Sequence, residues 1–242
     1  MFVVIKSLAE VHRLLGRLLK EERSAAPKLE EFYSRHPEDE LSEEFFDEFA
    51  DIMDRIWGVE AIIGWSSSTA ILMSAIDLES TINRFCFFDL GETTTEAIES
   101  LPMWAKLEVA HRVMGLSEFK GSKAFQYVRE LATWRNKFSH GKNTDMPIRT
   151  LRDNHLQEPK ILPEVEQVIG ELVKLVRGYI FVDRYLSNIA RHPYGKGYSL
   201  DLDDAEEWVR LISLYRFRDG RIMGKAPERP RRRFHTSFAL DV

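Results

Sequence analysis

One short stretch of the sequence combines three residue types that could act on a phosphodiester: Arg135, Asn136 and His140. If this stretch is helical, Asn136 and His140 are four residues apart and share a helix face, so the amide can hydrogen-bond the imidazole and orient it. Histidine can accept or donate a proton near neutral pH, which suits attack of a ribose 2′-hydroxyl on the adjacent phosphate. An arginine beside it can stabilise the charge that develops on the phosphoryl oxygens. The three residues are therefore candidate catalytic residues.

The spacing of these residues leaves a structural alternative open. Arginine and histidine are frequent enough in this chain that an Arg-to-His pair at this separation is close to a chance occurrence. A histidine in the last turn of a helix can simply interact with the free carbonyls and the negative end of the helix dipole. The basic residues that flank the motif are either substrate contacts or solvated helix charges. The candidate substrate contacts are Arg129, Lys137 and Lys142.

No metal ion or other cofactor is expected at this site. The sequence has no cluster of His, Cys and carboxylate residues at the spacing of metal ligands. The acidic segment 38–54 spreads its carboxylates round a helix surface, and no histidine joins them at a useful spacing. The one cysteine, Cys86, lies in an apolar run and is predicted to be a small buried hydrophobic residue. His111, in a predicted helix, is expected to be structural rather than catalytic.

The elements that must position these residues are predicted to be helices. Apolar residues recur at helical spacing through most of the chain, and strand signals are nearly absent, so an all-α, up-and-down bundle is expected. The helix with the candidate site is expected to begin after Ser122 as its N-cap and to end before Gly141. The predicted helices cover residues 4–22, 41–57, 59–88, 98–114, 123–140 and 163–186, with a short helix or strand at 203–215 and an extended tail beyond 220.

The motif and its surroundings resemble the HEPN superfamily (higher eukaryotes and prokaryotes nucleotide-binding domain). The signature of that family is an Arg, then a polar residue, then a His a few residues later. The match is the segment 135–140, Arg-Asn-Lys-Phe-Ser-His, on a late helix, and the segments 78–85 and 104–107 on earlier helices also look like the family. The resemblance covers about residues 59–190. It implies a bundle of four or five helices that dimerises and brings two motifs together in one cleft.

The resemblance also implies roles for the motif residues. Many members of the family are metal-independent endoribonucleases, often toxins or antiviral effectors. His140 would be the acid/base group, Arg135 the phosphate stabiliser and Asn136 the orienting residue. One subset carries a tyrosine two residues after the histidine, modified by a partner nucleotidyltransferase. This chain has Lys142 there, which argues against that form of regulation.

Three functions are compatible with these observations. The first is a metal-independent endoribonuclease that acts on RNA as a homodimer, in a toxin or phage-defence setting, with an antitoxin or another protein as a further partner. The second is a non-catalytic HEPN module that binds a nucleotide, RNA or a partner protein, since fold does not settle activity. The third is an interaction scaffold in which the helix end is merely structural. The intact Arg-Asn-His set favours the first.

The charges of the chain are distributed unevenly. Residues 1–100 contain 9 Lys and Arg against 21 Asp and Glu, whereas residues 101–242 contain 25 against 18. The basic segment 218–233 could clamp RNA phosphates, with salt-dependent affinity, or dock on the acidic N-terminal helices of the same or a partner chain, which we slightly favour. The predicted organisation is a helical extension over 1–58, a HEPN-like bundle over 59–190, and a C-terminal extension with a basic tail over 191–242.

The composition is that of a soluble globular protein, with 44% hydrophobic and 30% charged residues. The longest uncharged run, 61–76, contains several hydroxyl residues and is shorter than the roughly 20 residues of a membrane-spanning helix. The apolar start of the chain lacks the basic leader of a signal peptide. We therefore expect a cytoplasmic protein without a membrane segment.

Overall fold

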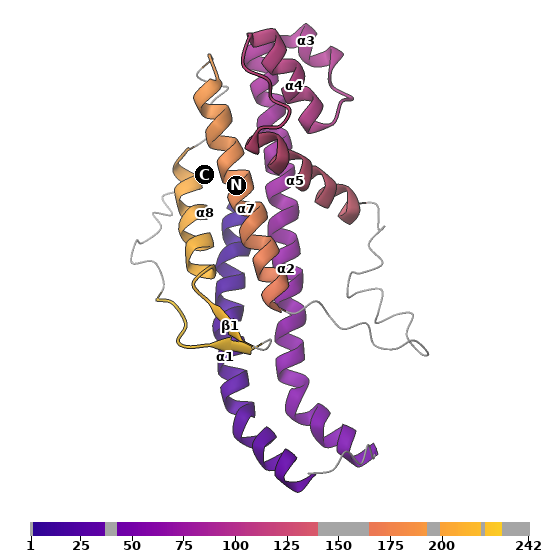
Figure 1. Cartoon of the computed structure of the whole chain (residues 1–242), viewed down its shortest axis with the longest axis vertical. Coiled ribbons are helices and arrows are strands. Elements are labelled where there is room, and N and C mark those ends of the chain that lie inside the picture. The colour runs from indigo at the N-terminus through magenta and orange to yellow at the C-terminus, as the bar shows by residue number, and fades with distance from the viewer. Residues whose placement is uncertain (1, 37–42, 140–164, 193–198, 219–220, 229–242) are drawn as a thin grey trace, which may run out of the picture.

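The computed structural model describes residues 2–36, 43–139, 165–192, 199–218 and 221–228, and most of these residues are helical (Figure 1). The predicted all-α class is confirmed for this part of the chain, with one small addition. Two short strands pair antiparallel near the C-terminal end, with Phe217 opposite Ile222. The elements are α1 (Phe2–Arg35), α2 (Glu43–Leu90), α3 (Glu92–Ala97), α4 (Met103–Met114), α5 (Lys123–Ser139), α7 (Val165–Ile189), α8 (Ser199–Ile212), β1 (Arg216–Arg218) and β2 (Arg221–Met223).

The longest element, α2, is the axis of the fold. Its 48 residues extend about 70 Å at the helical rise of 1.5 Å per residue. The helices α1 and α7 run along it, whereas α5 crosses it (Figure 1). The two helices that we predicted over 41–57 and 59–88 are a single helix, because a glycine such as Gly58 costs a helix only about 1 kcal/mol and packing against α1 outweighs that cost. The boundary that we predicted at residue 58 falls inside α2.

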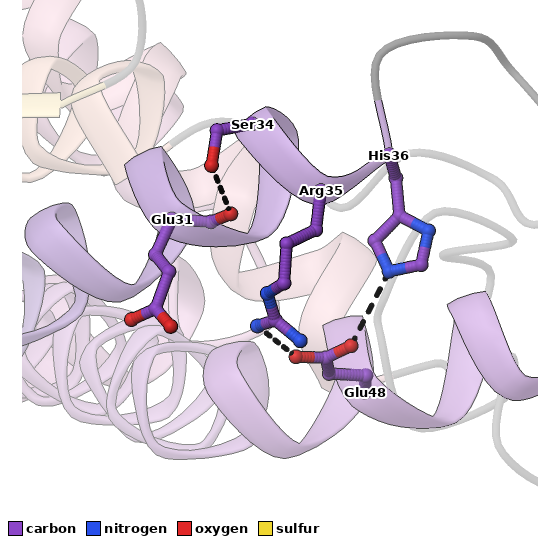
Figure 2. A network of polar contacts seen from close by, with 5 residues as sticks. All are labelled: Glu31, Ser34, Arg35, His36 and Glu48. Carbon is purple, nitrogen blue, oxygen red and sulfur yellow. Dashed lines mark hydrogen bonds and ion pairs between the residues drawn. The ribbon is translucent and has the colours of Figure 1, made fainter.

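Polar and aromatic contacts connect the end of α1 to the beginning of α2, and Figure 2 shows the polar ones. Arg35 forms an ion pair with Glu48, and the His36 Nε2 atom lies 3.4 Å from the second oxygen of the same carboxylate. The hydrogen bond from Arg35, helped by His36, holds the pKa of Glu48 below its ordinary value. Beside this network Phe32 is fully buried, with its ring centroid 4.8 Å from that of Phe45.

One hydrophobic core continues through all the large helices. From α7, the fully buried Tyr179 donates a hydrogen bond of 2.6 Å to Asp77 of α2. The C-terminal elements pack on α1, where the Tyr215 hydroxyl donates to the carbonyl oxygen of His12 at 3.2 Å. The terminal segments therefore share their core with the central bundle. The segment 203–215, for which a helix or a strand was open, is helical through Ile212.

The region between α2 and α5 differs from our prediction of one helix over 98–114. The structure has the short helix α3, a turn, and then α4, which begins at Met103. Pro102 explains the difference, because a proline disfavours helical geometry in the residue before it and is tolerated at the start of a helix. Gly91 separates α2 from α3 with a φ of 86°, a backbone conformation that favours glycine.

Two predictions about buried side chains are confirmed. Cys86 is fully buried, and burial raises the pKa of its thiol to about 11. His111 is buried in α4 and connects separate segments of the bundle. Its Nδ1 lies 2.8 Å from the carbonyl oxygen of Ser117, and its Nε2 lies 2.8 Å from the hydroxyl of Tyr185. A neutral imidazole that donates to the carbonyl and accepts from the hydroxyl satisfies both contacts, which is a structural role.

A half-buried carboxylate connects α1 to the strand pair. Glu22 accepts a hydrogen bond from the backbone N–H of Ile222 at 3.1 Å. Burial raises the pKa of Glu22 to about 7, and the nearby Glu60 carboxylate adds to this rise, whereas the hydrogen bond from Ile222 and the charge of Arg221 oppose it. The folded protein therefore binds a proton at Glu22 more tightly than the unfolded chain does.

This pKa predicts a pH-dependent effect of the substitution Glu22→Gln. The stability that comes from the raised pKa is present below the ordinary value of 4.5 and is lost as the pH rises toward 7. Glutamine cannot ionise, and its amide oxygen can still accept from Ile222. We therefore expect the variant to raise the free energy of unfolding at pH 8 by about 1 kcal/mol, a value reduced for partial exposure, and to have little effect at pH 4.

The measurement is urea unfolding of the wild type and the variant at both pH values. The control is Glu30→Gln, an exposed glutamate on the same helix. An equal effect of Glu22→Gln at pH 4 and pH 8 would contradict the assignment.

By length and apolar composition alone, α2 could cross a membrane over Phe45–Leu90. A single helix of this kind is weak support for a membrane protein, since the core helix of a soluble protein passes the same test. The cytoplasmic location and the absence of a membrane segment stay predictions.

Candidate functional site

The candidate site is at the C-terminal end of α5. This helix begins as predicted, because the Ser122 hydroxyl accepts a hydrogen bond of 3.1 Å from the backbone N–H of Phe125 and so caps the first turn. Val128 and Leu131 are fully buried, one turn apart on the face of α5 that packs into the bundle. This buried face fixes the rotation of α5 about its axis and therefore decides which side chains of its last turns face α2.

A close approach between α5 and α7 fixes the distance between these two helices. Gly178 of α7 lies against the Tyr127 ring, and a Cβ atom added at Gly178 would be 2.5 Å from Cδ1 and 2.8 Å from Cγ of that ring. Only a glycine allows the helices to pack this closely. An exposed ion pair between Lys174 of α7 and Glu130 of α5, at 2.9 Å, lies beside this contact.

Arg135 extends the buried face of α5 and reaches α2. One of its terminal nitrogens forms an ion pair with Glu79, and the other donates to the Asn136 side-chain oxygen at 3.3 Å. The side chains of Arg135 and Glu79 are each about 30% exposed, so the guanidinium is held in place and still accessible to a ligand. The sequence did not reveal Glu79, because nothing in the spacing of two residues 56 positions apart indicates that they meet.

The structure describes only some of the other candidate residues. Asn136 is exposed and contacts Arg135, whereas His140 and Lys142 lie outside the described residues, so the predicted hydrogen bond between Asn136 and His140 stays a prediction. Lys137 belongs to α5, but its side chain is not among those described. Of the predicted catalytic residues, the described part of the chain therefore shows one contact, the hydrogen bond between Arg135 and its sequence neighbour Asn136.

Arg129 lies apart from Arg135. Its guanidinium carbon is 5.7 Å from the centroid of the Phe125 ring, and it lines an open groove of about 420 Å³ between α5 and α7, together with Trp134 and Lys174. Arg135 follows Arg129 by six positions in the sequence, which places the two side chains on different faces of the helix. If Arg129 binds RNA, it contacts a different part of the strand from the part at Arg135.

A second polar pair lies one helical turn along α2 from Glu79. Lys106 of α4 is only 5% exposed and donates a hydrogen bond of 2.8 Å to the side-chain oxygen of Asn83. Both residues line a cavity of about 330 Å³ between α2, α3 and α4. Because Asn83 follows Glu79 by four residues, the two pairs Arg135–Glu79 and Lys106–Asn83 are neighbours along one side of α2.

An uncharged surface on α2 continues from this site. Ile62, Trp65 and Ile76 are each almost half exposed, and their separations of 3 and 11 residues place them on one helix face. We call these three residues the α2 stripe. Glu79 follows Ile76 by three residues, so the stripe ends beside the Arg135–Glu79 pair. The α2 stripe is a candidate surface for contact with another molecule.

Among the described residues, no group of three or more His, Cys, Asp or Glu side chains could hold a metal ion.

The fold and the site together define a class of protein: a helical bundle with an arginine-centred polar cluster where one helix crosses a long central helix. In comparisons with models of protein families, with curated proteins and with solved structures, nothing matches this chain. The resemblance to the HEPN superfamily thus rests on the segment 135–140 and its helical setting.

Proposed function

We propose that this chain is a HEPN-type, metal-independent endoribonuclease of the cytoplasm, acting in a toxin or phage-defence setting with Arg135, Asn136 and His140 as its catalytic residues. The observation that supports this proposal best is the environment of the Arg135 side chain. Its guanidinium is oriented by a carboxylate from another helix and remains partly exposed, five residues before His140 in the sequence. An arginine that is oriented by a carboxylate and is still exposed is suited to stabilising the negative charge on a phosphoryl group.

The reaction would use the ribose next to the scissile bond. His140 removes the proton of the 2′-hydroxyl, and the 2′-oxygen attacks the phosphorus. The bond from phosphorus to the 5′-oxygen breaks, which leaves a 2′,3′-cyclic phosphate and a 5′-hydroxyl. Arg135 stabilises the charge on the non-bridging oxygens, and Glu79 orients Arg135. Asn136 hydrogen-bonds the imidazole of His140 and fixes its tautomer.

This chemistry favours a homodimer. The leaving 5′-oxygen needs a proton while the 2′-hydroxyl loses one, and a second histidine can supply that proton most directly. Each chain has one Arg-Asn-x3-His motif, so a second copy is the natural source of the second His140. The α2 stripe offers a surface for that copy, since the uncharged face of Ile62, Trp65 and Ile76 ends beside Arg135 and Glu79.

The alternative is a non-catalytic module of the same fold that binds a nucleotide, RNA or a partner protein. One specific observation favours it: Glu79 already neutralises the charge of Arg135. In that case the arginine would serve mainly to hold α5 against α2.

The test is cleavage of RNA by the purified full chain in excess EDTA. We expect cleavage products with 2′,3′-cyclic phosphate and 5′-hydroxyl ends, produced by a species that sediments as a dimer. A folded dimer that cleaves no RNA, across a mixed pool of structured and unstructured substrates, would overturn the enzyme and leave the binding module. Cleavage that stops when EDTA is added would overturn the metal-independent mechanism.

A further inference from the structure

The cavity next to the Arg135–Glu79 pair has the chemistry of a base-binding pocket. It has a volume of about 330 Å³ and lies between α2, the short helix α3 and α4. Its lining combines a buried ammonium, apolar side chains and carboxylates. Its lining includes Asn83, Phe87, Glu92, Glu96, Ile98, Glu99 and Lys106.

Lys106 is the most informative of these residues. It is only 5% exposed, and its one hydrogen bond among the described residues goes to the neutral side-chain oxygen of Asn83 at 2.8 Å. No carboxylate in the described part of the chain lies within ion-pair distance of its ammonium group. A lysine ammonium has three N–H donors, and burying the charge without full compensation is costly. The cavity therefore presents strong donor capacity that a bound acceptor could satisfy.

The rim of the cavity is acidic, in contrast to the ammonium group of Lys106. Glu96 and Glu99 are exposed side chains that line it, together with Glu92. Three carboxylates against one ammonium repel a phosphate or another anion, so an anionic ligand is disfavoured. The ligand that fits is neutral, with hydrogen-bond acceptors for Lys106 at one edge and donors for the glutamates at another.

The walls of the cavity favour a flat, partly apolar ligand. Ile98 is buried, and the Phe87 ring is 45% exposed, so the ring offers a face on which a planar group can stack. Guanine combines all the required features. Its O6 and N7 atoms are acceptors that a lysine commonly contacts, its N1–H and exocyclic amine are donors for carboxylates, and its ring stacks on aromatic side chains.

The position of the cavity connects it to the candidate active site. Asn83 follows Glu79 by one helical turn, which is about 6 Å along α2. A nucleotide whose phosphate lies at Arg135 can therefore place its own base, or that of its neighbour, at this cavity. We propose that the cavity is a guanine-binding subsite that selects the nucleotide next to the scissile phosphate. This inference rests on the proposed ribonuclease function for its role in cleavage, but the binding of guanine can be tested separately.

The experiment is isothermal titration calorimetry of the full-length protein with each of the four ribonucleosides. Nucleosides lack a phosphate, so their binding does not depend on Arg135 or His140. We expect guanosine to bind at least about tenfold more tightly than adenosine, cytidine or uridine. The substitutions Lys106→Met and Glu96→Gln should each weaken guanosine binding about tenfold or more.

Methionine at position 106 keeps the length of the side chain without its charge, and thermal unfolding of the variant verifies that the bundle is intact. The control is Lys174→Met, an exposed lysine of α7 that lines the other groove. Equal binding of all four nucleosides, no binding, or unchanged guanosine binding by Lys106→Met would each overturn the subsite.

Mapping of the RNA cleavage positions separates this inference from the proposed function. Cleavage without any preference for guanine, combined with no guanosine binding, overturns the subsite and leaves the ribonuclease. Selective guanosine binding by a protein that cleaves no RNA supports the subsite and overturns the ribonuclease. Cleavage next to guanine that loses this preference in Lys106→Met supports both.

Discussion

Replacement of Arg135 by alanine is expected to lower the rate of RNA cleavage about 10²- to 10³-fold, the usual effect of removing a group that stabilises transition-state charge. Replacement of His140 by alanine is expected to lower it about 10²- to 10⁴-fold, because the general acid–base group is lost. The measurement is single-turnover cleavage of a saturating RNA substrate in EDTA. Since the two residues act on the same transition state, the double variant should be little slower than the slower single variant.

The fold should survive the loss of Arg135, because the Arg135–Glu79 pair is partly exposed and such pairs contribute little to stability. Glu79→Gln should lower the rate by a smaller factor than Arg135→Ala, since glutamine can still accept a hydrogen bond from the guanidinium. The control is Arg112→Ala, an exposed arginine of α4 that forms an ion pair with Glu108 of its own helix and lies outside the candidate site. Full activity of Arg135→Ala would remove the catalytic assignment, whichever residue is then responsible.

Replacement of Gly178 by alanine is expected to destabilise the protein by about 2–3 kcal/mol, the upper part of the usual range for overpacking a core. The new methyl group would lie 2.5 Å and 2.8 Å from atoms of the Tyr127 ring that are near its backbone and have little freedom to move. The helices α5 and α7 would have to separate, which would also shift Arg135 relative to Glu79. We expect lower free energy of unfolding in urea and reduced cleavage by the folded fraction.

The same helix offers a control for the substitution itself. Gly170 of α7 is exposed, and an added Cβ would meet nothing within 4 Å, so Gly170→Ala should stabilise the protein by about 0.5–1 kcal/mol. Replacement of Tyr127 by alanine in the Gly178→Ala background should restore part of the lost packing, so the two effects should not be additive. Additive effects would show that the close approach is not the cause of the destabilisation.

The helices were largely predictable because each depends on local patterns. The apolar periodicity of α5 and its cap at Ser122 are both properties of neighbouring residues, and the structure confirms both. The predictions that differed involve competition between local and tertiary terms. Gly58 was expected to lie between two helices, yet packing along α1 keeps α2 continuous through it. The separation of α3 from α4 followed from Pro102, a local signal that the apolar periodicity obscured.

For the candidate site, the sequence by itself determined which residues share a helix. Arg135 and Asn136 are neighbours on α5 because they are consecutive in the sequence, and no tertiary contact is needed for that. Their partners were decided only by the tertiary structure. Glu79 meets Arg135, and Asn83 meets Lys106, because α5 and α4 pack against α2 at these positions. Such contacts depend on how the buried faces of helices that are far apart in the sequence pack together. The periodicity and capping residues of a single helix do not predict that packing.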